Sequence, residues 1–155
     1  MLIRLGDAAD VDAAVSVYER SNLARRQGSW PNRAARVERA LAHLREASSW
    51  FLLADEGPAP VGMASAEPLR EDGAAPVIPG GCFLHFLFVV PARGGEGIGG
   101  VILDSLLAEA KRRHYSRIHL WTHEDNKRSH RLYRSRGLSP TGRTADGEGE
   151  WAGEI

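Results

Sequence analysis

The chain has 155 residues, of which 43% are apolar, and its 20 basic side chains balance 20 acidic ones. This length suits one buried core and is short for two ordinary domains, so a single domain over residues 1–155 is expected. Zero net charge gives no general attraction to nucleic acid or to an anionic membrane, and neither is expected as a partner. The lone cysteine, Cys82, excludes an internal disulfide and gives no sign of a metal cluster.

The first half of the sequence predicts a strand, two helices and a hairpin. LIRL at 2–5 predicts a short strand, and Asp7 is placed to cap the helix that follows it. Two helical stripes recur at intervals of three and four residues: Val11, Ala14, Val15 and Tyr18, and then Val37, Ala40, Leu41 and Leu44. WFLLAD at 50–55 and PVGMASAEP at 60–68, separated by a turn-rich spacer, predict an antiparallel hairpin.

The second half adds the strongest strand of the chain. Residues 69–81 carry two prolines and three glycines and predict an exposed loop. CFLHFLFVV at 82–90 is almost continuously apolar, so we expect a central strand buried on both faces. A glycine-rich loop, a helix at 98–114, a strand at 117–122, a helix at 126–137 and a final hairpin follow. The predicted fold is α/β (α+β), with a mixed, mostly antiparallel sheet of six to seven strands and about four helices.

The apolar run at 83–90 is shorter than the ~20 residues that a membrane-spanning helix requires. The N-terminus meets acidic residues at once and has no signal-like apolar segment. These features predict a cytoplasmic protein without a membrane partner.

The loop RGGEGIGG at 93–100 has five glycines among its last seven residues, directly before a helix. A helix N-terminus leaves amide groups without partners and carries a partial positive charge, and glycines let an anion approach the backbone closely. A phosphate-bearing ligand is therefore predicted here. A kinase-type P-loop is excluded, because no lysine follows at the required spacing. A dinucleotide-binding pattern is formally present at Gly95, Gly97 and Gly100, which keeps an NAD(P)-dependent oxidoreductase as an alternative, although two-thirds of the chain precedes it.

The sequence resembles the GCN5-related N-acetyltransferase (GNAT) superfamily in two regions. The first is VVPARGGEGIGG at 89–100, and the second combines Asn126 with LYRSRGL at 132–138, where Tyr133 follows Asn126 by seven residues. The resemblance implies acetyl-CoA as co-substrate and no metal. It places the diphosphate on the amides of Gly95, Glu96, Gly97, Ile98, Gly99 and Gly100, and the pantetheine arm along Leu87, Phe88 and Val89. The chain departs from the pattern at Gly94, where the family has Gln or Arg, while Arg93 stands one position early.

The resemblance also implies catalytic roles. Tyr133 occupies the position of the usual acid that protonates the leaving thiolate, and Asn126 lies near the cofactor arm or caps a helix, or does both. A base for the incoming amine is sought among His85, His123 and Glu124, and His85 is preferred because of its place in the central strand. Some ribosomal-protein acetylating members carry a Glu where this chain has Trp121, which argues against their mechanism and substrate.

The acceptor is expected to be a primary amine of a small molecule. One loop offers Arg25, Arg26 and Trp30, suited to an anionic or planar group, and another offers Glu67, Glu71 and Asp72, suited to a cationic one. The two loops favour acceptors of opposite charge, so neither selects a substrate. A non-catalytic CoA-binding or sensing module is the main alternative, and a homodimer is expected only because dimers are common in the family.

Overall fold

A computed structural model describes residues 1–155, which form seven strands, four α-helices and two 3-10 turns. The strands pair in the order β1-β2-β3-β4-β5-β7-β6. Four of the pairs, β1–β2, β2–β3, β5–β7 and β6–β7, are antiparallel, while β4–β5 is parallel. The predicted mixed, mostly antiparallel sheet is therefore confirmed. The elements are β1 (Leu2–Leu5), η1 (Ala8–Asp10), α1 (Val11–Arg25), α2 (Arg33–Arg45), β2 (Trp50–Asp55), β3 (Pro60–Arg70), β4 (Val77–Val89), η2 (Pro91–Arg93), α3 (Ile98–Arg112), β5 (Arg117–His123), α4 (Lys127–Ser135), β6 (Ser139–Ala145) and β7 (Glu148–Glu154).

The chain forms two compact units, to both of which β4 and α3 contribute residues. The first unit comprises Met1–Ala66 and Phe86–Leu106, and the second comprises Glu67–His85 and Leu107–Ile155. The expectation of one domain over the whole chain stays a prediction. No helix is both long and apolar enough to cross a membrane.

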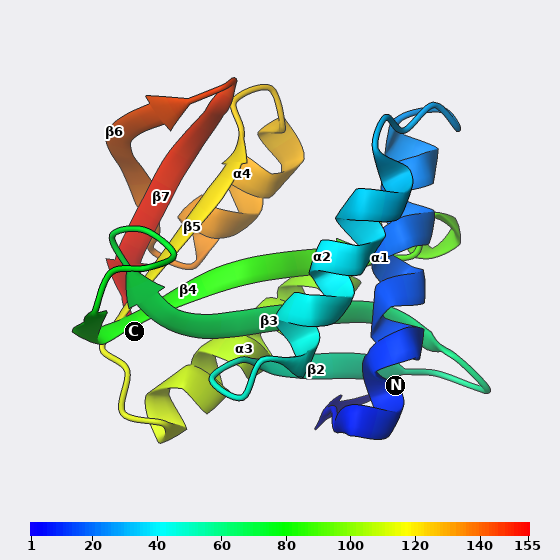
Figure 1. Cartoon of the computed structure of the whole chain (residues 1–155), viewed down its shortest axis with the longest axis horizontal. Coiled ribbons are helices and arrows are strands. Elements are labelled where there is room, and N and C mark those ends of the chain that lie inside the picture. Colours follow the sequence, from blue (N-terminus) through cyan, green and yellow to red (C-terminus); the bar gives the residue numbers. More distant parts are fainter. The chain divides into compact units, whose positions relative to one another are not determined.

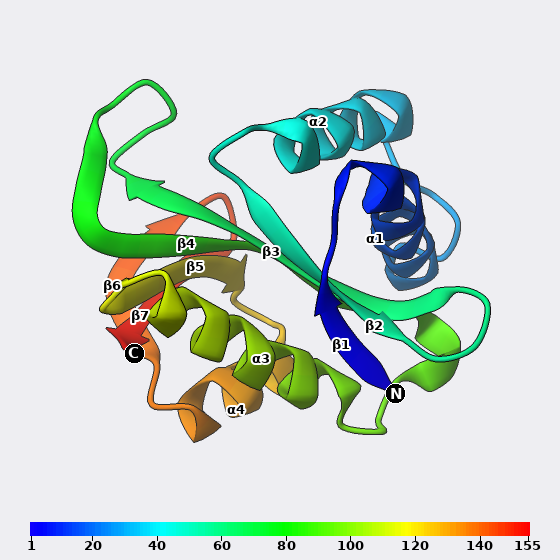
Figure 2. The same ribbon diagram turned by 90° about the horizontal axis from the view of Figure 1, so that it is seen from below.

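In the first unit, helices cover both faces of the strands. α1 and α2 lie together on one face of β2 and β3, and the first part of α3 lies on the other (Figures 1 and 2). Alternation along the strands sends Phe51, Leu53 and Met63 into the core beneath α1 and α2. The predicted helical stripes supply the facing side: Val11, Ala14, Val15, Tyr18, Ala40 and Leu44 are buried in the same cluster, and Val37 and Leu41 pack against it.

Close packing of α3 on β3 depends on Gly62. A Cβ atom on Gly62 would lie 2.5 Å from Ile102 Cδ1 and 3.1 Å from the Phe88 carbonyl oxygen. Any larger residue would push α3 away from the sheet, because protein interiors leave no room for an extra methyl group at such a distance. Since α3 begins at the end of the glycine loop, this contact helps to fix where that loop lies.

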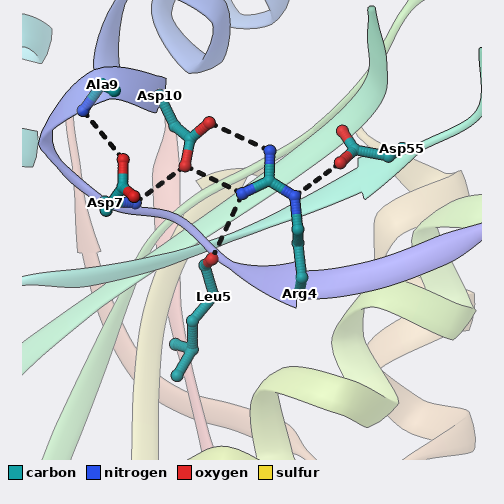
Figure 3. A network of polar contacts seen from close by, with 6 residues as sticks. All are labelled: Arg4, Leu5, Asp7, Ala9, Asp10 and Asp55. Carbon is teal, nitrogen blue, oxygen red and sulfur yellow. Dashed lines mark hydrogen bonds and ion pairs between the residues drawn. The ribbon is translucent and has the colours of Figure 1, made fainter.

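An ionic network ties β1 to the start of the first helical segment and to β2 (Figure 3). Arg4 Nε donates to Asp55 at 2.6 Å, and its two terminal nitrogens donate to the carboxylate of Asp10 at 2.8 and 2.9 Å. Asp7 accepts from the Ala9 amide, while Asp10 accepts from the Asp7 amide, both at 2.9 Å. The expected capping role of Asp7 is confirmed, at the 3-10 turn that leads into α1.

The second unit contains the end of the sheet and α4. β4 pairs with β5 over Gly81–Phe83, and β5 pairs along its whole length with β7. Figure 1 shows α4 running beside β5 and β7. Trp151 of β7 anchors this helix, because His130 stacks on its ring at a centroid distance of 5.0 Å and the Arg134 guanidinium lies 5.0 Å from the ring centroid.

Two expectations about β4 are corrected. The loop predicted over 69–81 is shorter, because β3 extends to Arg70 and β4 already begins at Val77. β4 is also not buried on both faces: His85 is exposed and Phe86–Val89 are only half-buried. In the second unit the last residue that pairs with β5 is Phe83, and His85 contacts both the ring of Phe83 and the carboxylate of Glu67. An apolar run in a sequence does not reveal where its neighbouring strand stops pairing.

Candidate active site

The glycine loop leaves β4 through the short turn η2 and enters α3. The Gly94 amide closes the turn on the Pro91 carbonyl at 3.2 Å. Gly95 and Gly97 then take φ angles of +83° and +79°, which the absence of a side chain permits. Residues 94–97 are exposed, whereas Ile98 is buried and anchors the first turn of the helix.

Six consecutive amides in this loop have no hydrogen-bond acceptor in the protein. The first hydrogen bond of α3 runs from the Val101 amide to the carbonyl of the loop residue Gly97 at 3.3 Å, so the amides from Gly95 to Gly100 remain unused. Such a run of backbone donors at the positive end of a helix suits a multiply charged anion, and a diphosphate offers enough oxygens to accept from several of them.

Arg93 does not face this loop as an unpaired cation. Its guanidinium binds two carboxylates, with Nε 2.8 Å from Glu96 Oε2 and a terminal nitrogen 3.2 Å from Glu56 Oε2. The hydrogen bond from Arg93 holds the pKa of the Glu96 carboxyl below its usual range. These two ion pairs tie the loop to the β2–β3 turn.

The end of β4 presents backbone groups away from β3. The Val90 amide donates to the Val61 carbonyl of β3 at 2.8 Å. Because backbone groups alternate between the two edges of a strand, those of Leu87 and Val89 point to the opposite edge, whereas those of Phe88 share the β3 side. Ser21 Oγ of α1 donates to the Val89 carbonyl at 3.0 Å, which leaves that oxygen its second lone pair. Leu87 and Val89 can therefore pair with an extended ligand.

Tyr133 is a buried phenol in the second unit. It projects from α4 toward Trp151, with ring centroids 6.2 Å apart, and only 6% of the residue is exposed. Burial raises the pKa of Tyr133 to about 12. The hydroxyl forms no hydrogen bond within the protein. A phenol that stays protonated and has no internal acceptor is suited to donate a proton to a ligand.

Asn126 caps α4, because its side-chain oxygen accepts from the Ser129 amide at 3.3 Å. This confirms the expected capping role. The cap fixes the start of the helix that carries Tyr133, so Asn126 acts on the position of the phenol through the backbone.

His85 lies on β4 in the second unit, with Nδ1 2.9 Å from Glu67 Oε1 on β3. About a third of each of the two side chains is exposed, 34% for His85 and 30% for Glu67. An ionised carboxylate accepts a hydrogen bond, so the pair favours the tautomer with hydrogen on Nδ1. The other candidate bases are less well supported: His123 lies 3.7 Å from Glu148, and Glu124 is exposed beyond β5.

The predicted residues divide between the two units. Leu87, Phe88 and Val89 lie in the first unit with the loop from Gly95 to Gly100, and His85, Asn126 and Tyr133 lie in the second. Two contacts were missed by sequence reasoning: the Ser21 bond to Val89 and the Glu67 bond to His85. Both join residues far apart in the sequence, and neither Ser21 nor Glu67 stands in a recognisable pattern.

Comparisons with known proteins agree with this geometry. The model of the acetyltransferase (GNAT) family matches residues 9–138. No curated protein matches the sequence significantly. The fold resembles that of the PaiA N-acetyltransferase from Thermoplasma acidophilum in complex with coenzyme A, at 14% identity, complete coverage of both chains (100% each) and a TM-score of 0.74.

Two further structures have the same fold. The ribosomal-protein-alanine N-acetyltransferase from Brucella melitensis is 21% identical, with 100% of both chains covered and a TM-score of 0.74. The yncA acetyltransferase from Salmonella typhimurium with its cofactor acetyl-CoA is 22% identical, with 99% of this chain and 93% of that chain covered and a TM-score of 0.72.

Proposed function

Because this chain belongs to the acetyltransferase (GNAT) family, we propose that it transfers the acetyl group of acetyl-CoA to a primary amine of a small molecule. Membership confirms the family inferred from the sequence, the enzyme class of acyltransferase and the use of acetyl-CoA. The observation that carries the proposal is the run of six unused amides from Gly95 to Gly100.

The cofactor is proposed to bind through main-chain groups. The amides of Gly95, Glu96, Gly97, Ile98, Gly99 and Gly100 hold the diphosphate, with the Arg93–Glu96 pair keeping the loop free of net negative charge. The backbone groups of Leu87 and Val89 pair with the pantetheine arm as they would with a neighbouring strand, while those of Phe88 face β3. The Ser21 hydroxyl steadies the Val89 carbonyl at the end of this segment.

Acetyl transfer requires a neutral amine and a protonated leaving group. His85, oriented by Glu67, accepts the proton of the substrate ammonium. The amine nitrogen then forms a bond to the acetyl carbon, and the bond from that carbon to sulfur breaks. The second proton that the nitrogen loses as the amide forms passes to solvent and replaces the proton that Tyr133 gives up. Tyr133 donates its phenolic proton to the sulfur, and its raised pKa keeps that proton in place until it is needed. No covalent acetyl-enzyme is required, so both substrates are bound when the reaction occurs.

A screen of primary amines tests the function directly. Purified protein is incubated with acetyl-CoA and each amine, and release of free CoA is followed with a thiol reagent. We expect amine-dependent CoA release from at least one small molecule. Tight acetyl-CoA binding without turnover of any amine would instead favour the non-catalytic CoA-binding or sensing module. The family match gives no support to the NAD(P)-dependent oxidoreductase.

The homodimer stays a prediction, based only on the family. Light scattering on the eluted protein would measure the mass in solution against the 16.9 kDa of one chain.

A further inference from the structure

Four residues of α1, α2 and the segment between them gather hydrogen-bond donors without supplying a carboxylate. They are Tyr18, Arg26, Trp30 and Arg36, which we call the Tyr18 donor cluster. Tyr18 is its centre, with its ring 5.4 Å from that of Trp30 in an edge-to-face contact. Burial raises the pKa of Tyr18, and the positive charges of Arg36, Arg39 and Arg26 act in the opposite direction, so these guanidinium groups lie within electrostatic reach of the phenol.

Three donors of this cluster are buried without an acceptor. The Nε atoms of Arg26 and Arg36 and the Nε1 atom of Trp30 have no hydrogen-bond partner, and Trp30 is only 7% exposed. Arg33 of α2, the helix that carries Arg36, forms an ion pair with Glu19 at 2.7 Å. Neither Arg26 nor Arg36 forms an ion pair. Buried polar groups are nearly always paired in native proteins, so three unpartnered donors within the segment from Arg26 to Arg36 indicate a missing acceptor.

The cluster adjoins the end of β4. The Tyr18 ring lies 4.7 Å from the ring of Phe86 and 5.4 Å from that of Phe88. These two phenylalanines flank Leu87, whose backbone groups are proposed to pair with the pantetheine arm. Ser21, one helical turn after Tyr18, contacts the Val89 carbonyl. An anion held by the cluster would therefore lie on the α1 side of the strand segment along which the cofactor arm is placed.

We propose that the Tyr18 donor cluster binds the carboxylate of the acceptor, so that the enzyme acetylates a carboxylate-bearing amine of the amino-acid class. This inference rests on the proposed acetyl transfer. Two guanidinium groups and an indole N–H are all donors, and guanidinium geometry matches a carboxylate. A carboxylate carries one charge, and its desolvation beside Trp30, Phe86 and Phe88 costs less than that of a doubly charged phosphate. The aromatic rings then contact the body of the same molecule.

Matched acceptor pairs test the proposal by kinetics. L-Phenylalanine is compared with phenethylamine, which lacks only the carboxylate, and phosphoethanolamine is compared with ethanolamine. We expect the amino acid to have a KM about tenfold or more below that of its decarboxylated partner, as hydrogen bonds to a charged group imply. Arg26→Gln, Arg36→Gln and Trp30→Phe should raise the KM of the amino acid with little change in kcat, and the two arginine variants should leave the KM of phenethylamine unchanged.

Arg25→Gln is the control, because Arg25 precedes Arg26 in the chain, is exposed and lies outside the cluster. This variant should leave the KM and kcat of both L-phenylalanine and phenethylamine unchanged. Equal KM values for the members of the carboxylate pair, or discrimination only in the phosphate pair, would overturn the proposal while leaving acetyl transfer intact.

An NMR titration separates failure of this inference from failure of the proposed function. The chain has four tryptophans and thus four indole N–H groups, and the Trp30→Phe variant identifies the signal of Trp30. Addition of L-phenylalanine should move the Trp30 signal downfield, and phenethylamine should not. This readout needs no turnover. An inactive protein whose Trp30 signal shifts would still have the carboxylate site, whereas an active protein whose Trp30 signal does not shift would lack that site.

Discussion

Tyr133 illustrates how burial prepares a single residue for its proposed role. Its ring is held by Trp151, and its pKa of about 12 keeps the phenol protonated at neutral pH. Tyr133→Phe removes only the hydroxyl, which has no partner in the protein. We therefore expect kcat to fall about 100-fold or more while the melting temperature and the acetyl-CoA affinity stay unchanged.

Tyr115→Phe is the matched control for that variant. Tyr115 is also partly buried in the second unit, and burial raises its pKa too, but it lies outside the proposed site. Loss of the Tyr115 hydroxyl should leave kcat unaltered. Wild-type turnover by Tyr133→Phe, measured as CoA release at saturating substrates, would remove the acid role.

The glycine loop is the element on which cofactor binding depends. Gly97 has a φ angle of +79°, and a Cβ atom there would meet nothing within 4 Å, so Gly97→Ala changes backbone preference without a clash. An L-residue in this left-handed region costs about 1–2 kcal/mol, and we expect acetyl-CoA binding to weaken about tenfold in calorimetry. Gly73→Ala is the control, since Gly73 is equally uncrowded and has no positive φ. Equal losses in both variants would mean that the loop conformation is irrelevant to binding.

The β1–η1 junction gives a pH-dependent contribution to stability. Arg4 donates two hydrogen bonds to Asp10 and holds the pKa of that carboxyl well below its usual range. A lowered pKa in the folded state stabilises the protein above the ordinary carboxyl value of ~4, and this contribution is lost as the pH falls toward the folded value. Arg4→Gln should lower the melting temperature by a few degrees at pH 7, and the gap from the wild type should narrow below about pH 4. A gap that widens at low pH would contradict the role of Arg4.

Most elements of the fold could be predicted from the sequence because local patterns determine them. The helical stripes around Val15 and Ala40, the hairpin of β2 and β3 and the mixed, mostly antiparallel sheet were all predicted. The exposure of His85 was not, since it depends on where β5 stops pairing and on Glu67, 18 residues away. The contact of Trp30 with Tyr18 and the unpartnered donors of Arg26 and Arg36 were missed for the same reason, because they depend on the packing of α1 against α2.

The residues of the candidate site also differ in whether the sequence could indicate them. The glycine loop, Asn126 and Tyr133 stand in recognisable spacings, so the sequence could indicate them. Arg93 stood at an unexpected position, and only the structure shows that it binds Glu96 and Glu56. A guanidinium in a sequence does not reveal its carboxylate partner when that partner lies on another turn of the chain.

For the whole molecule, ligand binding should appear as a gain in thermal stability. A ligand present at 100 times its Kd adds about 2.7 kcal/mol to the free energy of unfolding. Acetyl-CoA should therefore raise the melting temperature, whereas NAD(P) should not. A rise with NAD(P) and none with acetyl-CoA would contradict the assignment of the cofactor.

The most direct test is a titration of ¹⁵N-labelled protein with acetyl-CoA, followed through backbone amide signals. We expect the largest shifts at the amides from Gly95 to Gly100, because six donors without a partner gain the oxygens of a diphosphate. Saturable binding that leaves these six signals in place would show that the cofactor binds elsewhere, and the proposed site would then be wrong.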